Sequence, residues 1–169
     1  MKEWLGLAAR LVTGVVWIVA GALKLPDPAA SVRAVRAYDL LPESVVPTVG
    51  HLLPAVEIVV GGALVLGLFT RVAASVSAIM YLLFIVGIAS VWSRGIEIEC
   101  GCFGGGGAKA GASSSYPWEI ARDAGLLLLS LFLVWSPRTR LSLDTVLFPP
   151  LPDPRGSEDV EVEPRDVAR

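Results

Sequence analysis

The gathering of apolar residues into long blocks constrains the fold of this chain more than any other feature of its sequence. Hydrophobic residues make up 54% of the 169 residues, and charged residues make up 18%. A helix that crosses a hydrocarbon core of about 30 Å needs about 20 apolar residues. Blocks close to this length cover residues 4–23, 52–69, 72–93 and 119–136. Each block is therefore a candidate membrane-spanning helix.

Few charges interrupt these blocks. The first contains Arg10, the second contains Glu57, the third has no charge, and the fourth is apolar after Asp123. In lipid, backbone amides must find their hydrogen bonds within the protein, which a helix achieves by itself. The sequence therefore predicts an all-α fold, an integral membrane four-helix bundle, whose first partner is the lipid bilayer. We expect this domain to cover residues 1–140.

Small and aromatic residues agree with a bundle in a membrane. Tryptophans fall near the ends of the blocks, as an interfacial belt places them, at Trp4, Trp92, Trp118 and Trp135. Small residues permit close packing of helices, and the predicted helices carry them at Gly14, Gly21, Gly61, Gly62, Gly67, Ala73, Ala74, Ser77 and Ala78.

The connections between the blocks differ in character. Residues 24–50 form a long polar connection in which we expect a short amphipathic helix, Ala29–Leu40, along the membrane surface. Thr70 and Arg71 are predicted to form a tight turn. Residues 94–118 form a glycine-rich loop, expected to be flexible, that contains both cysteines. The segment 141–169 is polar, rich in proline and acidic, and is predicted to be disordered.

The distribution of Lys and Arg gives an orientation. Arg71 and the pair Arg138 and Arg140 lie directly beside helix ends on the side that holds both termini. Positive charge close to helix ends favours the cytoplasmic side. We therefore expect a multi-pass protein of the cell membrane with its cysteine loop on the extracytoplasmic side. The net charge of −2 does not favour nucleic acid as a partner.

The two cysteines lie in one short motif, Cys100-Gly-Cys102. Two thiols can form a redox couple or half of a metal site, but they cannot staple a secreted scaffold. A bridge between residues two apart closes a small ring, so we expect a somewhat strained disulfide. Exposed disulfides of this kind tend to be labile or catalytic. Cys100 and Cys102 are therefore the candidate catalytic residues for thiol–disulfide exchange.

Two other interpretations of the cysteine pair stay open. The pair can be a structural clasp in a membrane assembly or scaffold factor that is not an enzyme. It can also belong to a carrier of a soft metal or small solute, since thiolates suit soft ions such as Cu(I). A metal would need a third ligand or a second chain, so no metal ligands are assigned.

Further ionisable residues are expected at the same end of the bundle as the cysteines. Lys24 ends the first predicted helix, Glu57 lies about five residues into the second, and Arg122 and Asp123 lie near the start of the fourth. Helices that alternate in direction bring these positions to one membrane face. Ionisable residues inside a membrane are costly and indicate a functional site.

Two roles are open for these residues. They can form a structural network in which Glu57 pairs with Arg122 or Lys24. Alternatively, their charge can favour the attacking thiolate, or they can hold a small polar or quinone-like molecule between the helices. No cofactor follows from the sequence, although a membrane quinone is a candidate for the exchange of electrons.

Several motifs together resemble the DoxX/MauE group of four-helix membrane proteins, over about residues 5–136. They are Gly21-Ala-Leu-Lys24-Leu-Pro-Asp-Pro28, Tyr38-Asp-Leu-Leu-Pro42, and Pro54-Ala-Val-Glu57 with Gly61. The motif Cys100-Gly-Cys102-Phe-Gly104, followed by Trp118 and Arg122-Asp123, is similar to the methylamine-utilisation type, MauE.

The resemblance implies a role in the cell envelope. MauE proteins are associated with maturation of the periplasmic methylamine dehydrogenase small subunit, which is rich in disulfides. The chain is thereby expected to support disulfide formation or electron transfer, with Cys100 and Cys102 carried over as site residues and Lys24, Glu57, Arg122 and Asp123 as supporting ones. The partner would be an envelope thioredoxin-like protein or a disulfide-containing client.

Overall fold

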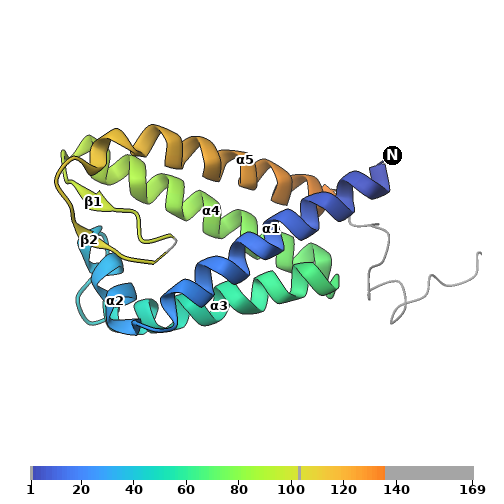
Figure 1. Cartoon of the computed structure of the whole chain (residues 1–169), viewed down its shortest axis with the longest axis horizontal. Coiled ribbons are helices and arrows are strands. Elements are labelled where there is room, and N and C mark those ends of the chain that lie inside the picture. The colour runs from blue at the N-terminus through green and yellow to red at the C-terminus, as the bar shows by residue number, and fades with distance from the viewer. Residues whose placement is uncertain (1, 103, 136–169) are drawn as a thin grey trace, which may run out of the picture.

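Four long helices and one short helix make up most of the computed structural model, which describes residues 2–102 and 104–135. The long helices are α1 (Lys2–Lys24), α3 (Val46–Leu66), α4 (Thr70–Ser93) and α5 (Tyr116–Trp135), and the short one is α2 (Pro28–Ala37). Figure 1 shows that α2 and the cysteine-bearing loop lie at the end of the bundle opposite the N-terminus. The predicted all-α fold class is confirmed. The predicted disorder of residues 141–169 falls outside the described residues.

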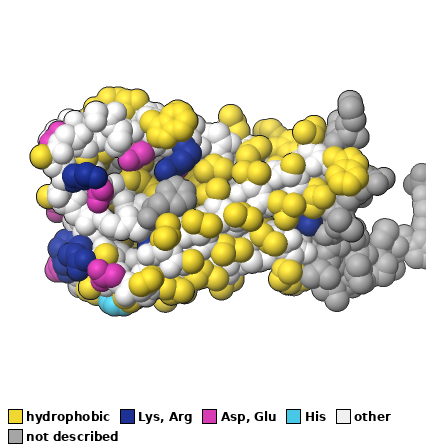
Figure 2. All heavy atoms as spheres, in the orientation of Figure 1, with side chains coloured by type: hydrophobic (Ala, Val, Ile, Leu, Met, Phe, Trp, Pro, Cys, Tyr) yellow, Lys and Arg dark blue, Asp and Glu magenta, His cyan; other side chains and the backbone are white. Residues whose placement is uncertain are grey.

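Among the described residues, three helices are long and apolar enough to span a membrane, namely α1 over Trp4–Lys24, α3 and α4. Large hydrophobic side chains such as Val59 and Leu83 are exposed on their outer faces, and Figure 2 shows hydrophobic side chains along the length of the bundle. The chain is therefore a multi-pass membrane protein. Helix α5 packs along α4 but carries Glu119, Arg122 and Asp123 in its first turns, so its membrane crossing stays a prediction.

Glycines bring the backbones of α1 and α3 into contact. A Cβ atom added at Gly61 would lie 2.7 Å from the carbonyl oxygen of Gly14, and one added at Gly14 would lie 2.9 Å from that of Gly61. Further along the same interface, a Cβ at Gly21 would lie 2.8 Å from the carbonyl oxygen of Pro54 and 3.2 Å from Cβ of Glu57. This close approach, typical of membrane helices, sets Glu57 against the last turns of α1.

A buried serine connects three helices in the middle of the bundle. The indole N–H of Trp17 in α1 donates to Ser77 Oγ in α4 at 2.7 Å, and Ser77 Oγ lies 2.9 Å from Ser130 Oγ in α5. Ser130 also donates to the carbonyl of Leu126. Since all these polar atoms are buried, their mutual bonds remove the cost of placing them among apolar side chains. The network fixes the register of α4 and α5 against α1.

Helix α3 begins earlier than the predicted residue 52. Its first residue is Val46, and Pro47 occupies the first turn, where a missing N–H removes no helical hydrogen bond. Pro54 lies inside the helix. Glu57 therefore follows eleven residues after the start of α3, about 16 Å along its axis, and lies deeper than the predicted boundaries placed it.

Two connections also differ from the prediction. The turn between α3 and α4 is Gly67–Phe69, with Gly67 left-handed at φ 69°, whereas Thr70 and Arg71 already belong to α4. Helix α2 ends at Ala37, and its residue Val32 is buried against Gly50 of α3. The short helix therefore packs on the bundle, and its exposed residues Pro28, Ala29, Arg33 and Arg36 lie on the other face.

The cysteine loop, residues 94–102 and 104–115, has some regular structure of its own. Strands β1 (Ile98–Glu99) and β2 (Gly107–Ala108) pair antiparallel, and a 3-10 helix, η1 (Ala112–Ser114), precedes α5. The two strands are too short to change the fold class. They hold the two halves of the loop together beside α2 (Figure 1).

Candidate functional site

The two cysteines form a disulfide, with their Cα atoms 5.4 Å apart. Cys102 is 8% exposed, whereas Cys100 is partly buried. Gly101 between them has φ +70°, and a Cβ there would lie 2.7 Å from Cβ of Ala34 in α2. A glycine is needed here for both the left-handed backbone and the close approach. The pair is thus seated on α2.

Glycines of the loop have a second use besides flexibility. A Cβ added at Gly106 would overlap with Cβ of Ala34, the side chain that Gly101 also meets. Two stretches of the loop therefore rest on one alanine of α2. The glycine-rich composition, which predicted flexibility, serves close packing in the structure.

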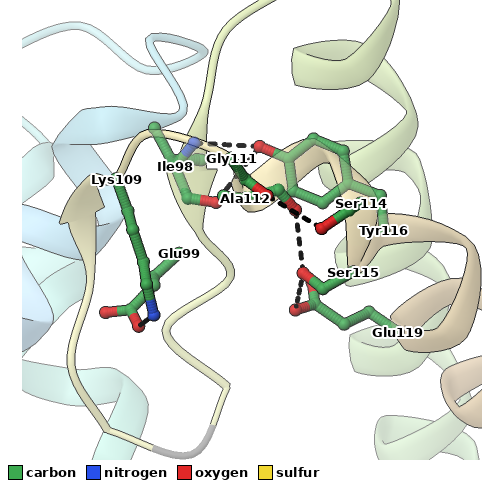
Figure 3. Close-up of polar contacts among 9 residues, drawn as sticks. All are labelled: Ile98, Glu99, Lys109, Gly111, Ala112, Ser114, Ser115, Tyr116 and Glu119. Atoms are coloured by element: carbon green, nitrogen blue, oxygen red, sulfur yellow. Dashed lines mark hydrogen bonds and ion pairs between the residues drawn. The ribbon is translucent and has the colours of Figure 1, made fainter.

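Two tyrosines anchor the loop (Figure 3 shows the second). The Tyr38 hydroxyl donates to the carbonyl of Cys100 at 2.8 Å, and burial raises the pKa of this hydroxyl, which keeps it a donor. The N–H of Ile98 donates to Tyr116 Oη at 2.9 Å, and the same hydroxyl lies 3.0 Å from the carbonyl oxygen of Ile96. These contacts tie the loop to α2 and to the start of α5.

The outer side of the loop carries charged groups in water. The Lys109 ammonium pairs with Glu99 across the hairpin (Figure 3), and this hydrogen bond lowers the pKa of the Glu99 carboxyl. Hydrogen bonds from the N–H of Gly111 and from Ser113 lower the pKa of Glu97. Both carboxylates are therefore ionised at neutral pH, and they face away from the apolar bundle.

Beneath the loop, Lys24 and Glu57 form a buried ion pair. Their side chains are 3% and 0% exposed, and the Lys24 ammonium lies 5.9 Å from the centre of the Phe84 ring. Of the two partners considered for Glu57 from the sequence, the structure has Lys24. A pair this deeply buried is held by its mutual attraction, because either charge alone would be very costly there.

The second pair of ionisable residues lies within α5. The Arg122 guanidinium donates to Asp123 Oδ1 at 2.8 Å, and the Asp123 side chain is 2% exposed. Arg122, Asp123 and Cys102 line a common small hollow between α1, α4 and α5. The structure therefore brings Arg122 and Asp123 to the inner side of the disulfide. The sequence predicts both residues and the cysteines at the same membrane face.

A cavity of about 270 Å³ lies on the other side of the disulfide. We call it the loop cavity; α2, α3, α4 and the cysteine loop enclose it. Its walls include the cysteines, Lys24, Ser31, Tyr38, Phe84 and Gly87, with leucines and valines over the rest. The disulfide is thus a wall of an apolar cavity.

A family model described as methylamine utilisation protein MauE matches residues 2–136. The chain belongs to the MauE family. This confirms the resemblance found from the sequence motifs, and the match covers every helix described above. Membership suggests a role in methylamine utilisation. No curated protein and no solved structure matches the chain.

The MauE chain brings five of the sequence-predicted site residues to one end of the bundle, and Glu57, farther along α3, reaches them through its ion pair with Lys24. Lys24 and the cysteines line the loop cavity, and Arg122 and Asp123 lie behind Cys102. Sequence reasoning missed Ser31 and Tyr38 of the same cavity. Tyr38 begins the motif Tyr38-Asp-Leu-Leu-Pro42 but was given no role, and Ser31 lies in no motif. The packing of α2 under the loop brings both to the cavity.

Metal ligands are sparse in the described part of the MauE chain. Within residues 2–102 and 104–135, no group of three or more His, Cys, Asp or Glu side chains is arranged to hold a metal ion. The single histidine, His51, lies on α3 with Nδ1 2.6 Å from the carbonyl oxygen of Pro47. The chemistry that these residues offer is that of the disulfide and the buried charges.

Proposed function

We propose that this MauE-family protein exchanges disulfides with envelope proteins, and so supports disulfide formation in methylamine utilisation. The observation that carries the proposal is the Cys100–Cys102 disulfide, which lies between an apolar cavity and the partly buried guanidinium of Arg122. A disulfide with two residues of separation stabilises the fold little, because the closed loop is very short. Its place in the structure is better explained by redox chemistry.

The two sulfurs have different roles in this exchange. Cys100 is the more exposed, so a client thiolate attacks its Sγ, and the Cys100–Cys102 bond breaks while a mixed disulfide forms. The electron pair of the broken bond leaves on Cys102. Arg122 lies beside Cys102, and a nearby cation favours a thiolate. A second client thiol then displaces Cys100, which leaves an oxidised client and two reduced cysteines.

The direct test is trapping of the mixed disulfide. In Cys102→Ser the Cys100 thiolate can attack the disulfide of an oxidised client and displace one of its thiols. The mixed disulfide has no internal thiol to resolve it, so we expect a covalent complex that a reductant dissolves on gel electrophoresis. Cys100→Ser is the matched control and should trap at least about tenfold less. The client is expected to be an envelope thioredoxin-like protein or a disulfide-containing protein of methylamine utilisation.

One pattern of results would contradict the exchange. If neither variant traps a complex and both only lower the amount of folded protein, the pair is a structural clasp of a scaffold factor. Client maturation at a normal level in both variants would also contradict the proposal.

A labelling experiment tests the side of the membrane. We place the cysteine loop outside the cytoplasm, where an oxidising compartment suits a disulfide. In intact cells, a membrane-impermeant maleimide should label the cysteines after treatment with an impermeant reductant and hardly at all before it. If labelling requires permeabilised cells, the loop lies in the cytoplasm. Exchange with envelope proteins would then be contradicted.

A further inference from the structure

The loop cavity has an unexplained polar atom in its wall. Ser31 is 3% exposed, it lines the cavity, and its Oγ has no hydrogen-bond partner within the described part of the protein. Buried hydroxyls nearly always have a partner, so an unpartnered one requires an explanation. If the hydroxyl turns toward the cavity, a ligand with a hydrogen-bond acceptor there would supply that partner.

A second donor lines the same cavity. Lys24 has three N–H donors on its ammonium group, and its bond to Glu57 Oε1 uses one of them. Ser31 and Lys24 also share the wall of the neighbouring hollow beneath the glycine loop, so the two donors belong to one region. The cavity therefore favours a ligand that carries carbonyl oxygens and no positive charge.

The remaining walls and the opening are apolar. Leu40, Leu41 and Leu83 line the cavity and are 51%, 43% and 62% exposed. Apolar side chains therefore surround the opening of the cavity. At about 270 Å³, the cavity is smaller than the roughly 300–1,000 Å³ of sites that enclose a whole drug-sized ligand. It fits a single substituted ring whose chain leaves through the mouth into lipid.

We propose that the loop cavity binds the ring of a lipid-soluble quinone, which reoxidises the cysteine pair. This inference rests on the proposed function, because it supplies the oxidant that the exchange consumes. The carbonyl oxygens of the ring accept hydrogen bonds from Ser31 and Lys24, and Phe84 lies beside the ring. The cysteines form the wall that the ring faces.

The reaction is balanced by two electrons and two protons. The S–H bonds of Cys100 and Cys102 break, and the S–S bond between them forms. The quinone takes up the two electrons and becomes a hydroquinone, and the two thiol protons end on its oxygens. One hydroquinone is made for each disulfide.

The experiment uses the full chain in nanodiscs of quinone-free phosphatidylcholine, reduced first and freed of reductant. Added decylubiquinone should be reduced in a saturable reaction, with one hydroquinone formed for each disulfide. Val35→Trp fills the cavity and should slow this reaction at least about tenfold. Val86→Trp is the matched control, because Val86 is 55% exposed on α4 and is not part of the cavity wall; it should react like the wild type.

A milder variant guards against a folding defect. Ser31→Ala removes one hydrogen bond, so the half-saturating concentration of decylubiquinone should rise about three- to tenfold with little change in the maximal rate. Ser93→Ala, an exposed serine that bonds within its own helix, should leave both values unchanged.

The results separate this inference from the proposed function. If the reduced wild type does not reduce decylubiquinone while Cys102→Ser still traps a client, the cavity is not a quinone site and the exchange stands. Equal effects of Val35→Trp and Val86→Trp would place the reaction elsewhere and also overturn the inference. Loss of trapping as well as of quinone reduction would reject both.

Discussion

Replacing Lys24 by methionine should destabilise the folded protein by about 3–5 kcal/mol, the cost of leaving a buried carboxylate without its partner. Glu57 is 0% exposed and pairs with Lys24, so its carboxylate would lose the charge that offsets its burial. The double variant Lys24→Met/Glu57→Leu removes both charges and should be about as stable as the wild type. Unfolding in detergent micelles, followed by circular dichroism against added SDS, measures the difference.

A surface ion pair provides the control for this prediction. Arg33 bonds Asp27, and their side chains are 54% and 59% exposed, so Arg33→Met should leave the unfolding curve nearly unchanged. If Lys24→Met and the double variant unfold alike, the loss of packing and not the unpaired charge causes the effect. In that case the ion pair between Lys24 and Glu57 would not be what stabilises the packing of α1 against α3.

The second large effect is expected at Gly61, where an alanine should cost about 1–3 kcal/mol through overpacking. The new methyl group would lie 2.7 Å from the backbone oxygen of Gly14, which cannot move without separating α1 from α3. Gly62→Ala is the matched control, since a Cβ there meets nothing within 4 Å. It should be neutral or stabilising by up to about 1 kcal/mol, because alanine is the better helix former.

The same unfolding assay compares these two neighbouring glycines. Equal stabilities of Gly61→Ala and Gly62→Ala would show that the helices can separate at little cost, and that the approach of α1 to α3 does not hold Glu57 in place. A loss at Gly61 alone would confirm the contact.

Apolar length was enough to predict where the long helices lie, because lipid leaves the backbone few alternatives. It failed at the start of α3, because residues 46–50 were assigned to the polar connection 24–50. Pro47 is tolerated because the first turn of a helix has no partner for its N–H. Boundaries outside the apolar blocks depend on such local chemistry, which hydropathy does not report.

The candidate site was predicted only in part for a different reason. Cys100, Cys102 and Glu57 stand out by residue type, since thiols and intramembrane charges are rare. Ser31 and Tyr38 are common residue types in a polar connection. Their importance comes from the packing of α2 beneath the loop, a long-range contact that spacing along the chain does not encode.

The bond between Tyr116 and the strand at Ile98 has a consequence for the energetics of redox cycling. It closes a ring of the chain with a sequence separation of 18 residues, and the cysteine bridge lies inside that ring with a separation of only 2. Loop-closure entropy grows with ring length, so opening the short cysteine ring frees little of it, and the bonds of Tyr116 do not depend on the sulfurs. The reduced protein should therefore keep the shape of the oxidised one, with little reorganisation of the chain in each cycle.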